Sequence, residues 1–138
     1  MASIRARDTK PELALRRALR AQGIRGYRCH ARGLPGSPDI VFTGLRIAVF
    51  VDGVWWHGHP EYFKPGRRGP YWDQKIARNV ERDARVEKEL RQLSWRVVRI
   101  WDVEVLRSPE AAASLVATVI EEQRQRLPKG RNRRGTAT

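Results

Sequence analysis

The stretch Pro38–Asp52, PDIVFTGLRIAVFVD, contains two short runs of Val, Ile and Phe separated by residues 43–45. Both runs are typical of strands, and because the connection is so short we expect them to pair as an antiparallel hairpin. Asp39 stands where the first strand begins, and Asp52 stands where the second strand ends. These two ends meet at one edge of the sheet, so we expect the two carboxylates to lie close together.

The segments around this hairpin follow helical and strand patterns. A helix is predicted after Thr9, which is a good N-cap, and it should close at Gly23. A short extended piece follows, and after the hairpin comes a long helix over about 71–93. Residues 95–101, WRVVRIW, are apolar enough for a strand in the middle of the sheet, and Ser108 caps a last helix. This order predicts an α/β fold with a mixed β-sheet flanked by helices.

The overall composition suits one compact domain with an anionic partner. The chain has 138 residues, a hydrophobic fraction of 41% and a formal net charge of +13, with a pI of about 11.2. A charge this high indicates nucleic acid or an anionic membrane surface as the partner. The sequence has no run of 18 apolar residues, no signal-peptide core near its start, and one cysteine, Cys29. We therefore expect an intracellular protein without a transmembrane helix.

Much of the positive charge lies in residues 124–138. This segment carries six of the 13 net positive charges, contains no acid and has almost no apolar residues. We predict that residues 1–123 form the folded domain and that 124–138 are a disordered basic tail. Such a tail can bind phosphates without sequence preference, although a solvated end without a partner accounts for the same composition.

The two aspartates of the hairpin carry the ligand type that hard cations such as Mg²⁺ prefer, namely carboxylate oxygen. Together at one sheet edge, Asp39 and Asp52 predict a metal site for phosphate hydrolysis. The alternative is that Asp39 is a turn residue and that Asp52 pairs with a surface arginine. Glu12 has the capping-box spacing from Thr9, but a helix start that faces the sheet edge would also let it reach water on the metal.

Three polar side chains alternate just after the second strand of the hairpin. His57, His59 and Glu61 are two residues apart, so in an extended segment they would point the same way. Both histidines could then bind one metal, or one of them could act as a general acid or base. The simpler alternative is a structural role for each.

The same segment places Trp55 directly beside Trp56. In an extended chain they would face opposite sides, so at least one should be exposed. In a basic protein the expected contact is a nucleic-acid base, because aromatic rings stack on unpaired bases and wedge between base pairs. Trp72 would either join them or lie in the core. The basic loop 64–70, KPGRRGP, is expected to bind DNA through Lys64, Arg67 and Arg68.

Five motifs span most of the chain from Ile4 to about Asp102. They are RARDTKPE (5–12), GLPGSPDIVF (33–42), AVFVDGVWWHGH (48–59), YWDQKIARNVERD (71–83) and LSWRVVRIW (93–101). Their order resembles that in the very-short-patch repair (Vsr) endonucleases. This resemblance implies the restriction-endonuclease-like fold of the PD-(D/E)xK superfamily. It also implies a DNA mismatch endonuclease that nicks one strand beside the thymine of a T:G mismatch, a product of 5-methylcytosine deamination.

The resemblance to Vsr further implies roles for single residues. Asp39 matches the metal-binding aspartate, and Val51 stands where a backbone carbonyl binds the metal. His57 matches the proposed general base, and Glu12 matches an acid that helps to hold water on the metal. Asp52 stands where the best-known member has a histidine. The aromatic residues that insert into DNA beside the mismatch correspond to Trp55, Trp56 and Trp72.

The best-known Vsr also carries a structural zinc ion, held by a histidine, an aspartate and two cysteines. His59 and Asp83 match the first two ligands, whereas Glu61 and Val103 stand at the two cysteine positions. Because both thiolates are absent, we do not expect a structural zinc here. We expect Asp83 to bond His59 directly, in a structural cluster with Glu61.

These expectations combine into a Mg²⁺-dependent endonuclease that acts as a monomer on mismatched double-stranded DNA, with mismatch-repair proteins as further partners. With this resemblance we expect it in the bacterial cytoplasm, associated with the nucleoid and not with membranes. A related PD-(D/E)xK nickase with another lesion or sequence target is the first alternative. A catalytically silent DNA-binding protein is the second. The presence of Asp39, His57 and Glu12 favours an active enzyme over the silent protein.

Overall fold

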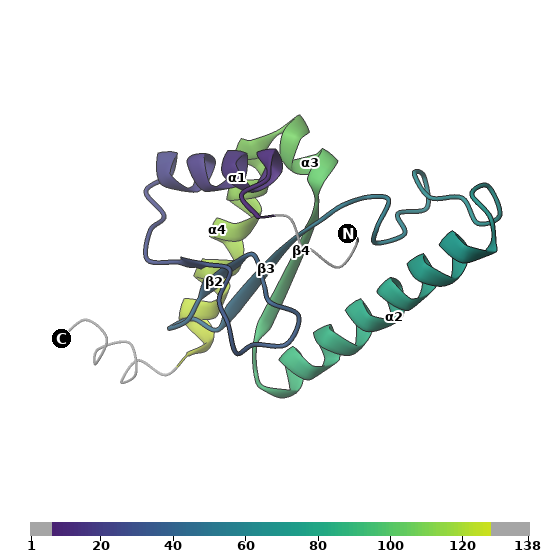
Figure 1. Ribbon diagram of the computed structural model, residues 1–138. Helices are drawn as coiled ribbons and strands as arrows, with labels where there is room; N and C mark the ends of the chain where they lie inside the picture. Colours follow the sequence, from purple (N-terminus) through teal and green to yellow (C-terminus); the bar gives the residue numbers. More distant parts are fainter. Residues whose placement is uncertain (1–6, 128–138) are drawn as a thin grey trace.

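The computed structural model describes residues 7–127 of the chain, and Figure 1 shows their arrangement. In chain order the elements are α1 (Lys10–Ala21), β1 (Arg28–Cys29), β2 (Ile40–Phe42), β3 (Ile47–Asp52), α2 (Pro70–Gln92), β4 (Arg96–Trp101), α3 (Asp102–Arg107) and α4 (Pro109–Arg126). This order confirms the predicted alternation of helices and strands. It adds one short helix, α3, that the sequence patterns did not predict.

Within the described residues the sheet is mixed and has the strand order β1-β2-β3-β4. The predicted hairpin is confirmed, because β2 and β3 are antiparallel with Ile40 opposite Val49. β4 runs parallel to β3 and lies at the edge, so the expectation of a central strand was wrong. Its apolar character has another cause: Val98 and Ile100 are buried beneath helices, while Arg99 between them is partly exposed.

Helices cover both faces of the sheet, and Figure 1 shows α2 on the side opposite to α1, α3 and α4. The larger core cluster joins α1, α3 and α4 to one sheet face, where Ile40, Val49 and Ile100 are buried. The smaller cluster contains Phe50 of β3 and Leu90 of α2 on the other face. α2 therefore packs chiefly through its C-terminal half, and its N-terminal half extends beyond the sheet (Figure 1).

Two helix starts follow the predicted capping chemistry. The hydroxyl of Thr9 accepts a hydrogen bond from the Glu12 backbone N–H at 3.5 Å, and α1 ends just before Gly23. The hydroxyl of Ser108 accepts a hydrogen bond from the Ala111 backbone N–H at 3.1 Å. Both caps satisfy backbone donors that have no partner inside the helix.

The predicted basic tail begins inside the last helix, α4. α4 continues to Arg126, so residues 124–126 of the predicted tail are helical. Residues 128–138, which were predicted to be disordered, lie outside the described residues. The first six residues, in which no signal-peptide core was expected, also lie outside them. None of the described helices is long and apolar enough to cross a membrane.

Candidate active site and nucleic-acid interface

Asp39 lies at the edge of the sheet, just before β2, and is 2% exposed. Its backbone N–H donates to the Val49 carbonyl at 3.0 Å, which continues the hairpin pairing by one residue. Its side-chain Oδ2 accepts a hydrogen bond from the Val51 backbone N–H at 2.7 Å. The two residues proposed to hold the metal are thus neighbours, and the Asp39 carboxylate is fixed against the end of β3.

Asp52, the last residue of β3, has different partners. The Nη1 atom of Arg99 donates to both of its carboxylate oxygens, at 3.2 and 3.0 Å. Burial raises the pKa of Asp52, and the positive charges of His57 and Arg99 offset part of this rise. Asp52 therefore pairs with an arginine, as the alternative interpretation of the sequence expected. That interpretation had a surface arginine, whereas the Arg99 side chain is only 21% exposed.

The two hairpin aspartates engage groups on opposite faces of the sheet. Asp52 and Phe50 alternate with Val51 along β3 and face α2, which supplies Phe50 with its packing partner Leu90. The charge of Asp39, in contrast, acts on Glu12 of α1. The two aspartates thus have different contacts, and a close approach of their carboxylates stays a prediction.

His57 lies between two carboxylates in the segment that follows β3. Its Nδ1 atom bonds the carboxylate of Asp83 on α2, and its Nε2 atom is 3.9 Å from Oδ1 of Asp52. Burial would lower the pKa of His57, but the hydrogen bond to Asp83 and the charge of Asp52 outweigh it, so the pKa lies above its usual value. The bond to Asp83 therefore orients a titratable ring beside Asp52.

The extended segment that would have given His57 and His59 a shared orientation is not present. Residues 53–63 form successive turns rather than an extended segment, as the bond from the His59 N–H to the Val54 carbonyl shows. The Nδ1 atom of His59 accepts a bond from the Glu61 backbone N–H at 3.1 Å, and its ring packs on Trp101. The expected bond between Asp83 and His59 is also wrong, because Asp83 bonds His57 instead.

Glu12 has a structural contact and also lies in the field of Asp39. It is 4% exposed, and its Oε1 accepts a hydrogen bond from the Asp8 backbone N–H at 3.0 Å, one residue before the N-cap. Burial raises the pKa of Glu12, and the negative charge of Asp39 raises it further. Glu12 therefore combines a structural contact at the start of α1 with a position close to Asp39.

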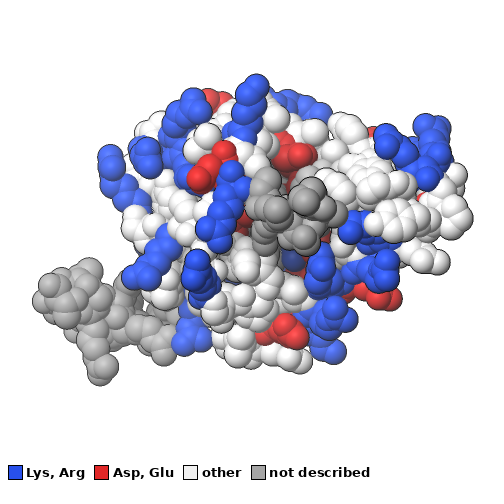
Figure 2. Space-filling model, viewed as in Figure 1, with Lys and Arg blue, Asp and Glu red and all other residues white. Residues whose placement is uncertain are grey.

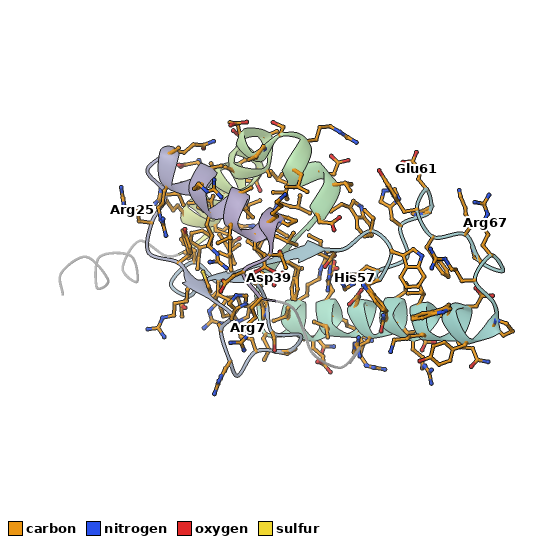
Figure 3. All side chains as sticks on the ribbon, turned by 45° about the horizontal axis from the view of Figure 1, so that its top comes forward. Arg7, Arg25, Asp39, His57, Glu61 and Arg67 are labelled. Carbon is orange, nitrogen blue, oxygen red and sulfur yellow. The ribbon has the colours of Figure 1, made fainter. Side chains whose placement is uncertain are left out.

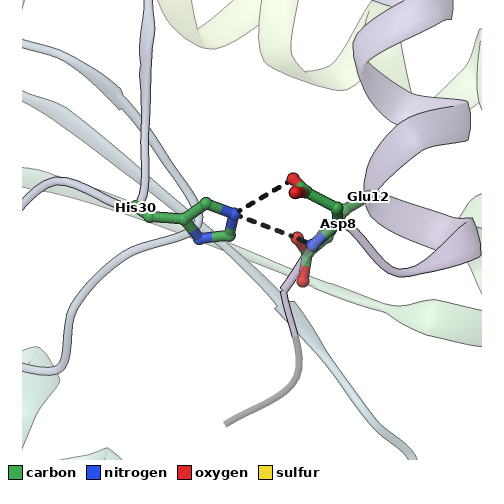
Figure 4. Close-up of side chains that lie close together, drawn as sticks. All are labelled: Asp8, Glu12 and His30. Atoms are coloured by element: carbon green, nitrogen blue, oxygen red, sulfur yellow. Dashed lines mark hydrogen bonds and ion pairs between the residues drawn. The ribbon is translucent and has the colours of Figure 1, made fainter.

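Sequence reasoning did not single out Asp8 or His30, which lie beside Glu12 (Figure 4). The His30 Nε2 atom is 3.4 Å from Asp8 Oδ1 and 3.6 Å from Glu12 Oε1, and these three residues could hold a cation. Arg16 approaches the same group, with Nη2 at 2.6 Å from Asp8. The pairing of β1 with β2 explains why His30 was missed: it brings the His30 N–H to the Asp39 carbonyl at 3.1 Å.

The three tryptophans form one cluster. Trp55 and Trp56 have ring centroids 5.0 Å apart, and Trp72 lies 5.0 Å from Trp55 and 5.7 Å from Trp56. The turns after β3 bring Trp55 and Trp56 together, so their predicted placement on opposite sides was wrong. Trp56 is 41% exposed, which confirms the expectation that at least one ring is accessible.

Basic side chains lie next to the tryptophan cluster, in the loop before α2. Lys64, Arg67 and Arg68 are exposed in the loop before α2, and the Arg68 guanidinium lies 5.3 Å from the ring centroid of Trp55. Figure 3 shows Arg67 on the projecting loop, beyond His57, and Figure 2 shows blue side chains at this end of the molecule. An exposed ring with cations around it is a suitable surface for a nucleic-acid strand.

Comparisons with known proteins identify the family. A profile of the family described as DNA mismatch endonuclease Vsr matches residues 1–62. Type II nicking enzyme V.NaeI of Lentzea aerocolonigenes is 42% identical over 125 residues, which cover 86% of this chain and 74% of that protein. Type II nicking enzyme V.XorIIP of Xanthomonas oryzae pv. oryzae is 42% identical over 107 residues, covering 76% of this chain and 78% of its own length. The chain belongs to the Vsr family.

Membership of the Vsr family confirms the expected fold class and enzyme class. The DNA mismatch endonuclease Vsr of Escherichia coli K12 is 41% identical over 104 residues, covering 74% of this chain and 66% of the relative. The mixed sheet with flanking helices agrees with the restriction-endonuclease-like fold of Vsr. The protein is a DNA nicking endonuclease, and nucleases of this family are generally metal-dependent.

Proposed function

We propose that this Vsr-family enzyme nicks one strand of duplex DNA beside a T:G mismatch. The observation that carries the proposal is the short segment after β3, in which Trp55 and Trp56 directly precede His57. The tryptophans cluster with Trp72, and His57 is anchored to Asp83, so the first turn and the middle of α2 fix this segment. A group that opens the duplex and a group that accepts a proton therefore lie on one loop.

The residues at the sheet edge fit a hard divalent cation such as Mg²⁺. Asp39 would bind it through its carboxylate and Val51 through its carbonyl, and both are oxygen ligands of the kind Mg²⁺ prefers. Glu12 supports this assignment, because it is buried and lies close enough to Asp39 for that charge to add to the effect of burial in raising its pKa. When bound, the ion would stabilise negative charge on the phosphate that is cleaved. Asp52 is left out, since Arg99 donates to both of its oxygens.

His57 is assigned as the general base toward the attacking water. The bond to Asp83 uses its Nδ1 atom and fixes the direction of the ring, which leaves Nε2 to accept the proton. Glu12 orients the water from the α1 side. The raised pKa of His57 means that the neutral, proton-accepting form grows as the pH rises through and above the usual histidine range.

The tryptophan cluster is assigned as the wedge that opens the DNA. Trp56, as the most exposed ring of the three, would enter the stack first, with Trp55 and Trp72 behind it. A mismatched step costs less to unstack than a matched one, so insertion favours the T:G site. The phosphates on either side would be bound by Lys64, Arg67 and Arg68.

A second candidate is nicking that depends on a defined flanking sequence. The names of the relatives from Lentzea and Xanthomonas as type II nicking enzymes favour it. The test is a set of labelled duplexes with Mg²⁺ that carry T:G or T:A in several flanking sequences. Cutting of T:G duplexes alone supports the mismatch proposal. Cutting of one flanking sequence regardless of the mismatch supports the second candidate.

We further propose that the enzyme acts as a monomer, near the chromosome and together with mismatch-repair proteins. A nick breaks one phosphodiester bond in one strand, so a single active site such as that around Asp39 and His57 suffices. Sedimentation of the protein with and without a mismatched duplex tests this. One protein per duplex is the expected stoichiometry, and two would contradict the proposal.

A further inference from the structure

Arg99 has no role in the proposed reaction, yet it contacts several groups around the candidate base His57. It projects from β4 at the edge of the sheet, and its side chain is 21% exposed. Its Nη1 atom donates to both oxygens of Asp52, at 3.2 and 3.0 Å. Its Nη2 atom donates to the Asp83 backbone carbonyl at 3.4 Å, and its guanidinium lies 4.3 Å from the Phe50 ring centroid. Arg99 thus contacts both acidic residues that flank His57.

Arg99 holds the Asp52 carboxylate in its position. Its Oδ1 is 3.9 Å from the Nε2 atom of His57, which is beyond hydrogen-bond distance. Because Asp52 is 6% exposed, its charge needs a partner, and without Arg99 the cation within reach would be a protonated His57. An imidazolium bonded to Asp83 through Nδ1 and to Asp52 through Nε2 would have no nitrogen left to accept a proton.

We propose that Arg99 is a positioning residue for His57, which holds the Asp52 carboxylate away from Nε2 and so leaves that nitrogen accessible to the attacking water. The inference rests on the proposed role of His57 as the general base. Arg99 does not touch the reacting atoms, and it acts through Asp52. Glu87 on α2 completes the arrangement, since its Oε1 accepts from Nε of Arg99 at 3.3 Å and fixes the guanidinium from its other edge.

The test begins with Arg99→Met, which keeps the length of the side chain and removes its charge. Among residues 7–127, the ionisable groups around His57 are Asp52 of β3, Asp83 and Glu87 of α2, and Arg99 itself. Loss of the guanidinium removes the only cation in this set apart from His57. We expect kcat for nicking of a T:G duplex to fall at least tenfold while KM for DNA changes less than threefold. In the DNA-free protein, we expect the NMR titration midpoint of the His57 ring to rise.

Two further variants separate positioning from a loss of fold. Adding Asp52→Asn to Arg99→Met removes the carboxylate that would otherwise trap the imidazolium, so it should restore most of kcat and return the midpoint toward that of the wild type. Arg96→Met is the matched control on the same strand, because it removes the ion pair of Arg96 with Glu122 at 2.8 Å, far from His57 in the register of β4. It should leave the His57 midpoint unchanged.

The NMR titration does not depend on nicking, so this inference and the proposed function fail separately. An unchanged His57 midpoint in Arg99→Met overturns the inference, and so does a double variant that shows no recovery. If Arg99→Met does not fold, Arg99→Lys takes its place, because a lysine keeps the charge but cannot donate to both Asp52 oxygens and fix Asp83 together. It should then show a smaller shift in the same direction, and the absence of any shift overturns the inference.

Discussion

The Nδ1 atom of His57 bonds the carboxylate of Asp83, and this contact ties the loop after β3 to the middle of α2. It fixes which ring nitrogen is free, and it raises the pKa of His57. The geometry is that of a base oriented by an acid, in which the acid determines the tautomer and the direction of the ring. This contact should therefore affect the pH dependence of nicking.

Replacement of Asp83 by Asn should change both the rate and its pH dependence. The bond to Asp83 raises the pKa of His57, so its loss should move the acidic limb of the kcat profile to lower pH. The maximal rate should nevertheless fall, by about 10²- to 10⁴-fold, because an amide selects the wrong tautomer. The measurement is single-turnover nicking across the pH range of histidine titration. Glu81→Gln, an exposed neighbour on α2, should change neither quantity; an acidic limb that stays in place in Asp83→Asn would contradict the assignment.

Replacement of Asp39 by Asn should separate cleavage from binding. The amide keeps the shape of the side chain but removes the charge proposed to bind the cation, so nicking should fall by about 10³-fold or more. Binding of a T:G duplex, measured by fluorescence anisotropy, should stay within a factor of about three. The same change should lower the pKa of Glu12, since the charge of Asp39 raises it. Nicking at the wild-type rate would remove Asp39 from the site.

Replacement of Trp56 by Ala should impair mismatch recognition more than general DNA binding. Stacking of one base on an aromatic ring contributes about 1–3 kcal/mol, so affinity for a T:G duplex should fall about 5- to 150-fold. Affinity for a matched duplex should change far less. Tyr62→Ala is the control, because Tyr62 is 45% exposed on the same loop but packs on His59 rather than on the tryptophans. An equal loss on both duplexes would argue against a wedge.

Gly58 supports the loop through a close approach to α2. It has φ of +72°, and an added Cβ would lie 2.9 Å from Val80 Cγ2 and 3.3 Å from Ile76 Cγ2. Gly66 on the same loop has φ of +90° and open space around it. Gly66→Ala should therefore cost about 1–2 kcal/mol of unfolding free energy from backbone strain. Gly58→Ala should cost about 1–3 kcal/mol more from the clash. Urea unfolding of both variants measures the difference, and equal costs would contradict the close approach.

The sequence predicted those features that depend on local patterns. The strand runs on either side of residues 43–45 led to the correct hairpin, and Thr9 and Ser108 led to the correct helix starts. The apolar run of β4 was misread, because burial under a helix and burial between two strands produce the same composition.

The candidate site was harder to predict, since its contacts join distant segments. Alternation along 55–61 suggested an extended chain, but turns after β3 separate His57 from His59 and bring Trp55 onto Trp56. The partner of Asp83 depends on how α2 docks, and the place of His30 beside Glu12 depends on the two-residue strand β1. No local pattern in the sequence encodes either contact.

The most direct test of the account is single-turnover nicking, with Mg²⁺, of two duplexes that differ only in carrying T:G or T:A at one position. Each strand carries its own label, so that the cut can be mapped to a bond. The account predicts one nick, in the thymine strand and next to the mismatched thymine, with the T:A duplex left intact. Equal nicking of both duplexes, or cuts that do not follow the position of the mismatch, would contradict it.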